Sequence, residues 1–211
     1  MARTADNVQR PSANAAGLAY AGGVALTASG YTVDDLLWAR QQFGTAHIEL
    51  DPWGNLIVTP ASDPHEIAAA ILHTLLVRQL DLPEECVLTP GLAWRVPGGT
   101  GFTNVPDLMI VAADASRVEE LHFAPPPLLI VEIASPSTRA IDRSRKLDDY
   151  RTGGAGVYLL IDLPGLTRVD RPTADMHDFG AGTTAAGLTG TIGVRVGDSR
   201  ATLDLDRLTP R

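Results

Sequence analysis

Two acidic residues lie within stretches of the sequence that are otherwise apolar. Asp107 opens the segment Asp-Leu-Met-Ile-Val-Ala directly after Pro106, and Glu132 interrupts the segment Leu-Leu-Ile-Val-Glu-Ile-Ala. A carboxylate buried in such a segment without compensation costs several kcal/mol. We therefore expect both side chains to be paired, hydrogen-bonded or bound to a metal ion.

A lysine that stands alone in the sequence follows these two acids. Of the 17 basic residues, sixteen are arginine and only Lys146 is lysine. Lysine supplies a compact ammonium whose pKa can shift, which a guanidinium cannot supply. Residues four apart share one face of a helix, so Asp142, Lys146 and Tyr150 could line one side of it. If that helix packs beside the two strands, the ammonium comes close to both carboxylates.

Structural interpretations of the same residues stay open at this stage. Asp107 could cap a turn and Glu132 could pair with an arginine, because buried ion pairs also occur away from catalytic sites. The cluster of Arg139, Arg143 and Arg145 fits a solvated helix face and a phosphate-contacting patch equally well.

The histidine at position 65 is also open to two interpretations. It lies near the start of a predicted helix, where a solvent-facing role and a catalytic role fit equally well. His65-Glu66 begins like the His-Glu-x-x-His motif of zinc proteases, but position 69 is alanine and the motif is incomplete.

The elements that must position these residues follow from periodicity and from turn and cap signals. Near-continuous apolar runs predict central strands covered on both faces. An apolar stripe of Ile67, Ile71, Leu75 and Val77 predicts the buried face of the second helix. Helices are predicted at about 32–43, 63–80 and 140–152, and strands at 46–50, 55–58, 86–89, 92–96, 107–112, 128–134 and 157–162. Edge β-structure is predicted in the tail from Thr167, with alternating pieces at 191–196 and 201–205.

Composition limits the classes of protein to consider. The chain has 211 residues, 45% of them hydrophobic, and no apolar run approaches the roughly 20 residues that span a bilayer. Residues 1–29 lack the pattern of a secretory signal, so we expect a flexible leader, a single domain over 30–211 and a cytoplasmic location. The single cysteine, Cys86, excludes an internal disulfide and a cysteine-cluster metal site, and we expect a buried, inert thiol.

The net charge of −8 argues against a nucleic-acid partner, because phosphate binding normally requires a basic surface. A metal site built from carboxylates would itself contribute negative charge, and bound cations reverse the local field. The charge therefore does not decide the question.

The motifs around these residues resemble the Uma-type (Uma-two) family of putative restriction endonucleases, a branch of the PD-(D/E)XK nuclease superfamily. The resemblance covers about residues 31–162. It is carried by Asn104-Val-Pro-Asp107, by Leu-Leu-Ile-Val-Glu132-Ile-Ala-Ser-Pro-Ser137 and by Asp142-Arg-Ser-Arg-Lys146-Leu-Asp-Asp-Tyr150, with Glu49-Leu-Asp-Pro-Trp-Gly54, Pro60–His65 and Gly154–Asp162 further out. The superfamily lysine follows the glutamate by two residues, where this chain has Ala134. Lys146 fits the family's migrated position on the next helix.

The resemblance implies an α/β (α+β) fold with a mixed central β-sheet flanked by helices, a restriction-endonuclease-like core with extra β-strands. It implies a Mg²⁺- or Mn²⁺-dependent endonuclease acting on DNA. Asp107, Glu132 and the carbonyl of Ile133 would hold the metal ion, Lys146 would assist catalysis, and Glu49 and His65 would complete or frame the site. Cleavage of both strands would favour a two-fold homodimer.

Two other functions stay open. One is a catalytically silent nucleic-acid-binding or interaction module that retains the fold, since function is grafted onto folds. The other is hydrolysis of a different substrate with Asp107 and Glu132 as acid and base, which predicts independence from metal.

Overall fold

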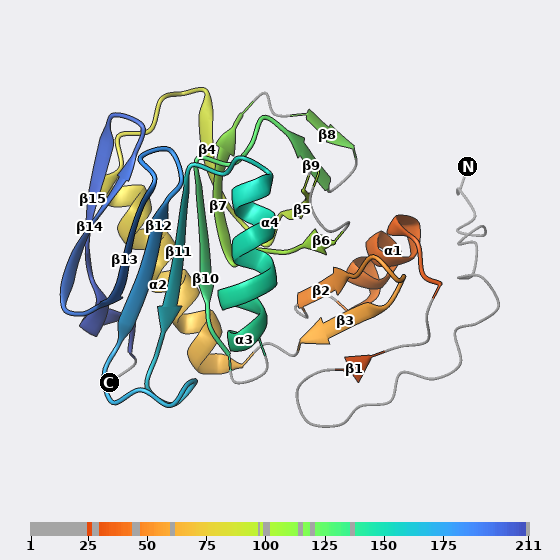
Figure 1. Cartoon of the computed structure of the whole chain (residues 1–211), viewed down its shortest axis with the longest axis horizontal. Helices are drawn as coiled ribbons and strands as arrows, with labels where there is room; N and C mark the ends of the chain where they lie inside the picture. The colour runs from red at the N-terminus through yellow and green to blue at the C-terminus, as the bar shows by residue number, and fades with distance from the viewer. Residues whose placement is uncertain are drawn as a thin grey trace, which may run out of the picture.

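The central sheet of the protein contains six strands in the order β13-β12-β11-β10-β7-β4 (Figure 1). The computed structural model describes residues 25–26, 30–43, 47–59, 62–96, 98, 102–113, 116–118, 121–135 and 138–209. The strands are β4 (Cys86–Pro90), β7 (Leu108–Ala112), β10 (Leu129–Ile133), β11 (Val157–Asp162), β12 (Thr173–Asp178) and β13 (Thr183–Leu188). Strands β10 and β11 run parallel and the other neighbours antiparallel, so the sheet is mixed, as predicted.

Helices cover both faces of this sheet (Figure 1). Helix α2 (Asp63–Gln79) packs against the side chains of Leu129, Val131 and Ile133. On the opposite face, Tyr150 of α4 (Leu147–Thr152) packs with Ile130 of β10. The alternation of β10 side chains between two apolar clusters explains why its sequence is apolar at nearly every position.

The buried face of α2 differs from the predicted stripe. Ile67 and Val77 are 45% and 55% exposed. The buried residues of the helix are His65, Ala68, Leu72, Leu75 and Leu76. Because most positions of this helix are apolar, periodicity alone did not select the face that meets the sheet. The observed face carries His65 inward.

The third predicted helix is one continuous run that contains an irregular turn. It consists of α3 (Arg139–Ile141), the π-helical turn η1 (Asp142–Lys146) and α4. The hydroxyl of Tyr158 donates to the carbonyl of Asp142 at 3.1 Å, at the first residue of the wide turn. Such turns are rare and often accompany functional sites. The run ends at Gly153-Gly154, as predicted, with Gly154 at φ 79°.

A second sheet contains seven short strands in the order β1-β3-β2-β6-β5-β9-β8. They are β1 (Ala25–Leu26), β2 (His47–Leu50), β3 (Leu56–Thr59), β5 (Ala93–Arg95), β6 (Thr103–Asn104), β8 (Ser116–Val118) and β9 (Leu121–Ala124). Helix α1 (Val33–Phe43) packs on β2 and β3 through Leu36, Ile48 and Val58. Strand β1 belongs to the predicted leader, whose residues 1–24 and 27–29 lie outside the described residues.

A tight turn fixes the register of β2 and β3. One carboxylate oxygen of Asp51 accepts hydrogen bonds from the backbone nitrogens of Trp53 and Asn55. Gly54 adopts φ 78°, and a Cβ there would lie 2.8 Å from the backbone nitrogen of Gly30. Glycine is therefore required at this position. The resulting register buries Ile48 against α1 and leaves His47 and Glu49 together on the other face of β2.

The C-terminal strands do more than form the predicted edge structure. Strand β12 lies inside the central sheet, and β13 forms its edge. Strands β14 (Thr191–Val196) and β15 (Ser199–Asp204) form a separate hairpin, followed by the 3₁₀ turn η2 (Leu205–Leu208). The backbone nitrogen of Thr202 donates to Gln79 at the end of α2, so the hairpin packs beside that helix. Among the described helices, none has both the length and the apolar character that a membrane span requires.

Candidate active site

The two acids that interrupt apolar segments are cross-strand neighbours. Strands β7 and β10 pair Met109 with Ile130 and Leu108 with Val131, so the next position places Asp107 opposite Glu132. Such neighbours have Cβ atoms about 4.5–5.5 Å apart. Asp107 is 5% exposed and Glu132 is 4% exposed. Both carboxylates are therefore buried together where the two strands meet the loops.

The only lysine of the chain lies against one of these carboxylates, that of Glu132. Its Nζ lies 2.9 Å from Oε1 of Glu132 and 2.9 Å from Oε1 of Glu49. The third neighbour, Oδ1 of Asp142, is 3.4 Å away. Lys146 is 3% exposed, so its ammonium does not point to bulk solvent. Tyr150 donates a 2.6 Å hydrogen bond to the same oxygen of Glu132. The predicted helix face of Asp142, Lys146 and Tyr150 thus meets the two strands.

Glu49 joins the group from the second sheet. Its Oε1 accepts a hydrogen bond from the backbone nitrogen of Val105 at 3.2 Å, and its Oε2 lies 3.8 Å from Arg145. Burial alone would raise the pKa of Glu49, but Lys146, Arg145 and the Val105 amide outweigh it and lower the pKa. Glu49 is therefore held as a carboxylate facing Lys146.

The group gathers several buried carboxyl groups around a single ammonium, that of Lys146. Three buried carboxylates, those of Glu49, Glu132 and Asp142, surround the ammonium of Lys146, and the buried Asp107 acts electrostatically on Glu132. Burial, only partly offset by Lys146 and increased by the neighbouring acids, raises the pKa of Glu132 to about 8. Burial also raises the pKa of Asp142, and the charge of Lys146 and a hydrogen bond with Thr138 offset this only in part. Uncompensated buried charge is costly, so the group favours an additional cation.

His65 faces Asp107 from the first turn of α2 and is buried. Its Nε2 lies 3.2 Å from Oδ2 of Asp107 and 3.1 Å from the carbonyl of Ile133. The backbone nitrogen of Ile133 donates to Oδ2 of Asp107 at 2.6 Å. Burial opposes protonation of His65, but Asp107 and Glu66 outweigh it and raise the pKa to about 9. Of the two alternatives for His65, the solvent-facing one is wrong.

The predicted site residues face one open cavity. Asp107, Glu132, Lys146, Glu49, His65 and Ile133 all contribute to its wall. The other lining residues are His47, Thr59, Ser62, Val105, Ser135 and Thr138. His47 was not predicted, although its position two residues before Glu49 on a predicted strand places both side chains on one face.

The arginine cluster is engaged by the protein's own acids. Arg139 lies 2.8 Å from Asp162, and Arg143 pairs with Asp162 and, at 3.1 Å, with Asp175. Arg145 donates to Asn104 at 2.7 Å, and its guanidinium lies 3.4 Å from the centre of the Phe102 ring. This is neither a simple solvated face nor a free phosphate-contacting patch.

The donors of this cavity suit a hard divalent cation. Carboxylate oxygens from Glu49, Asp107 and Glu132 and the carbonyl of Ile133 are oxygen ligands of the kind that Mg²⁺ and Mn²⁺ prefer. Lys146 and Tyr150 both engage Oε1 of Glu132, so neither occupies Oε2. The residues present fit such an ion on charge and on donor chemistry.

Comparison with known proteins identifies a family and a similar fold. A family model described as "Uma2: Putative restriction endonuclease" matches residues 35–178, which include every residue named above for the cavity. The chain is also similar to the crystal structure of a putative nuclease belonging to DUF820 from Anabaena variabilis. The identity is 14% and the TM-score 0.57, over 76% of this chain and 88% of that one, a likeness that confirms the fold. No curated protein matches the sequence.

Proposed function

The chain belongs to the Uma2 family of putative restriction endonucleases, and from this premise we propose that it is a Mg²⁺- or Mn²⁺-dependent endonuclease that hydrolyses DNA phosphodiester bonds. The observation that carries the proposal is the buried group of four carboxylates, three of which lie around Lys146 while Asp107 acts on Glu132. Hard cations bind such oxygen-rich sites. The family membership supplies the class of reaction, and the charge of the group supplies the reason for a metal ion.

Asp107, Glu132 and the carbonyl of Ile133 would hold the ion, with Glu49 as a further or supporting carboxylate. When bound, a divalent cation would polarise the scissile phosphate and lower the pKa of a water molecule. His65 and the Ile133 amide both contact Oδ2 of Asp107 and would keep this carboxylate in one orientation.

Lys146 would act on the phosphate rather than on the fold alone. Its ammonium faces the cavity between Glu49 and Glu132, where it can stabilise negative charge that develops on the phosphoryl oxygens or orient the attacking water. Tyr150 would fix the carboxylate of Glu132 through its 2.6 Å hydrogen bond.

A second candidate is a silent nucleic-acid-binding or interaction module. It is favoured by the net charge of −8 and by the internal pairing of Arg139 and Arg143, which leaves less basic surface for phosphates. A third is metal-independent acid–base hydrolysis of another substrate. The opposite pKa shifts of Asp107, lowered, and Glu132, raised, favour that candidate.

One assay separates the three. Supercoiled and linear DNA are incubated with the protein and Mg²⁺ or Mn²⁺, with a chelator control, beside the Glu132→Ala and Lys146→Ala variants. Nicking that requires the metal and is lost in both variants supports the endonuclease. Conversion of supercoiled DNA straight to the linear form would further indicate a two-fold dimer.

The remaining outcomes identify the rivals. DNA binding without cleavage by the wild-type protein, under every metal condition, supports the module. Hydrolysis of a non-nucleic-acid ester that survives chelation supports the acid–base enzyme. A cytoplasmic location stays a prediction, to be checked by fractionation of cells that produce the chain.

A further inference from the structure

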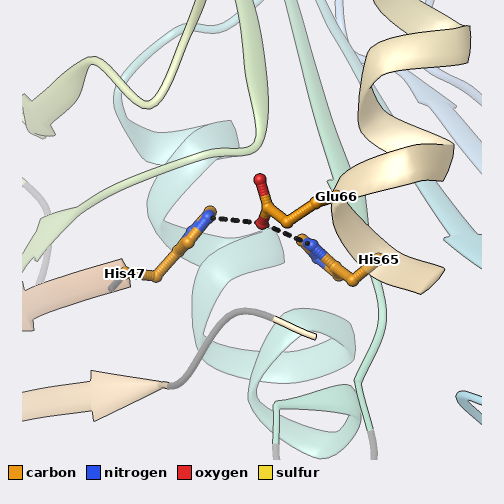
Figure 2. A group of neighbouring side chains, drawn as sticks. All are labelled: His47, His65 and Glu66. Carbon is orange, nitrogen blue, oxygen red and sulfur yellow. Dashed lines mark hydrogen bonds and ion pairs between the residues drawn. The ribbon is translucent and has the colours of Figure 1, made fainter. Parts of the chain in front are cut away.

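Three side chains that could hold a metal ion, two of them from the cavity wall, point toward one another (Figure 2). His47 comes from β2, and His65 and Glu66 come from the first turn of α2. Nε2 of His47 and Nδ1 of His65 lie 3.7 and 3.3 Å from the same oxygen, Oε1 of Glu66. The three potential ligand atoms lie within 4.8 Å of one another. In the His-Glu-x-x-His motif of zinc proteases, the second histidine stands on the same helix, at the position that Ala69 occupies here. In this protein the second imidazole is that of His47 and comes from strand β2.

The opposite ring nitrogens of both histidines face Asp107. Nε2 of His65 faces two acceptors, Oδ2 of Asp107 at 3.2 Å and the carbonyl of Ile133 at 3.1 Å, so it must carry a hydrogen. Nδ1 of His47 lies 3.5 Å from Oδ1 of Asp107. Nε2 of His47 and Nδ1 of His65 are therefore the ring nitrogens that face the Glu66 carboxylate.

We propose that His47, His65 and Glu66 bind a divalent transition-metal ion, with Zn²⁺ as the probe. Zinc binds imidazole nitrogen and carboxylate oxygen at about 2.0–2.2 Å, which separates tetrahedral ligand atoms by roughly 3.4 Å. The observed 3.3 and 3.7 Å separations match this value closely. Two imidazoles and one carboxylate also leave a coordination position for water or a ligand.

The proposed Zn²⁺ site differs from the proposed Mg²⁺ site in the atoms that would bind the ion. Imidazole nitrogen favours Zn²⁺ and similar transition metals, whereas a carboxylate-rich site favours Mg²⁺. Asp107 would hold both ligating rings through their other nitrogens, an arrangement by which a supporting carboxylate orients metal-bound histidine. The side chain of Glu66 is 50% exposed, which gives the ion a path from solvent. The inference does not rest on nuclease activity, because it concerns binding alone.

The test measures zinc binding by the full chain. Metal-free protein is titrated with Zn²⁺ in competition with a chromogenic chelator, in excess Mg²⁺ so that oxygen-rich sites are occupied. The variants are His47→Ala and Glu66→Gln, whose replaced side chains are 26% and 50% exposed, so neither leaves a core cavity. His73→Ala on the same helix and Glu132→Gln in the carboxylate group are the matched controls.

The expected result is one zinc per chain, with affinity at least about tenfold lower in both variants and unchanged in both controls. Co²⁺ should give visible absorption bands with the wild-type protein and lose them in His47→Ala. Undiminished zinc affinity in His47→Ala, loss of zinc in Glu132→Gln, or the absence of stoichiometric zinc would each overturn the proposal. An inactive protein that still binds one zinc would contradict the proposed nuclease function and leave this inference standing.

Discussion

Glu132 and Asp162 are both buried acids on adjacent parallel strands, yet their surroundings differ in one decisive way. Asp162 ends β11 and is paired with Arg139 and Arg143. These guanidinium groups outweigh the effect of burial and lower its pKa. Glu132 on β10 shares Lys146 with two other carboxylates, those of Glu49 and Asp142, and burial raises its pKa to about 8. The balanced acid stabilises the fold, and the acid in the unbalanced group is the one that favours a further cation.

This difference shows that burial of an acid does not by itself identify a site. Both residues interrupt or end apolar strands, so sequence position alone treats them alike. What separates them is the ratio of carboxylates to cations around each one. A strongly perturbed pKa in a cavity is a marker of function, whereas a satisfied ion pair is a marker of structure.

The largest expected effect is on DNA cleavage. Lys146→Ala should lower the metal-dependent cleavage rate about 10²–10³-fold, because it removes the only ammonium beside the proposed phosphate position. Asp162→Asn should retain cleavage within about twofold. Single-turnover rates on supercoiled DNA measure both. If Lys146→Ala and Asp162→Asn lowered the cleavage rate equally, the proposed difference in role between the surroundings of Glu132 and those of Asp162 would be wrong.

The next largest effect is on the free energy of unfolding, which should fall when Asp162 is replaced and rise when Glu132 is replaced. Asp162→Asn should lower the free energy of unfolding by about 1–3 kcal/mol, because Arg139 and Arg143 lose a charged acceptor. Glu132→Gln, measured in chelator at neutral pH, should raise it by about 1 kcal/mol, because burial disfavours the ionised form of Glu132 and raises its pKa to about 8. Urea unfolding curves of the three proteins give both values. A loss of stability in Glu132→Gln would show that the carboxylate group is already balanced.

A smaller effect is expected at the tyrosine that holds Glu132. Tyr150→Phe keeps the ring packing with Trp94 and Tyr158 and removes only the 2.6 Å hydrogen bond. The free energy of unfolding should fall by about 1 kcal/mol. Cleavage should weaken without being lost. An inactive but fully stable Tyr150→Phe protein would indicate a direct chemical role for the hydroxyl.

The smallest effect is the pH dependence of the balanced acid. The pKa of Asp162 lies below its ordinary value of 3.8 in the folded protein. Its stabilising contribution is therefore present above that ordinary value and disappears as the pH falls through the folded value. The stability difference between wild type and Asp162→Asn should be constant from neutral pH to about pH 5 and shrink below pH 3.8. A difference that persists in stronger acid would mean that the aspartate does not act through its charge.

Much of the fold followed from local patterns. The apolar runs gave the central strands β7, β10 and β11, and the turn before Asn55 gave the β2–β3 hairpin. Lys146 was predicted to come close to the carboxylates of Asp107 and Glu132, and its Nζ lies 2.9 Å from Glu132. This prediction was drawn from the helical spacing of Asp142, Lys146 and Tyr150 and from the presence of a single lysine. Both are local features of the sequence, and the folded chain keeps these three residues on one helix face.

The parts that sequence missed depend on contacts between distant elements. Strand β12 joins the central sheet, although its segment contains Asp175, His177 and Asp178 and lacks an apolar run. His47 meets His65 only because a second sheet packs beside α2, and no spacing within the chain reports that. The half-buried Cys86 also differs from the expected buried thiol, because it starts β4 at the edge of the central sheet.

The isolation of the lysine in sequence and its burial in space have a practical consequence. Because the chain has no other lysine side chain, an amine-directed reagent has a single side-chain target, and that target is enclosed by Glu49, Glu132 and Asp142. Its slow modification in the folded protein would report directly how often the cavity opens. The rate at which Lys146 is modified thus measures how accessible the cavity is to the reagent.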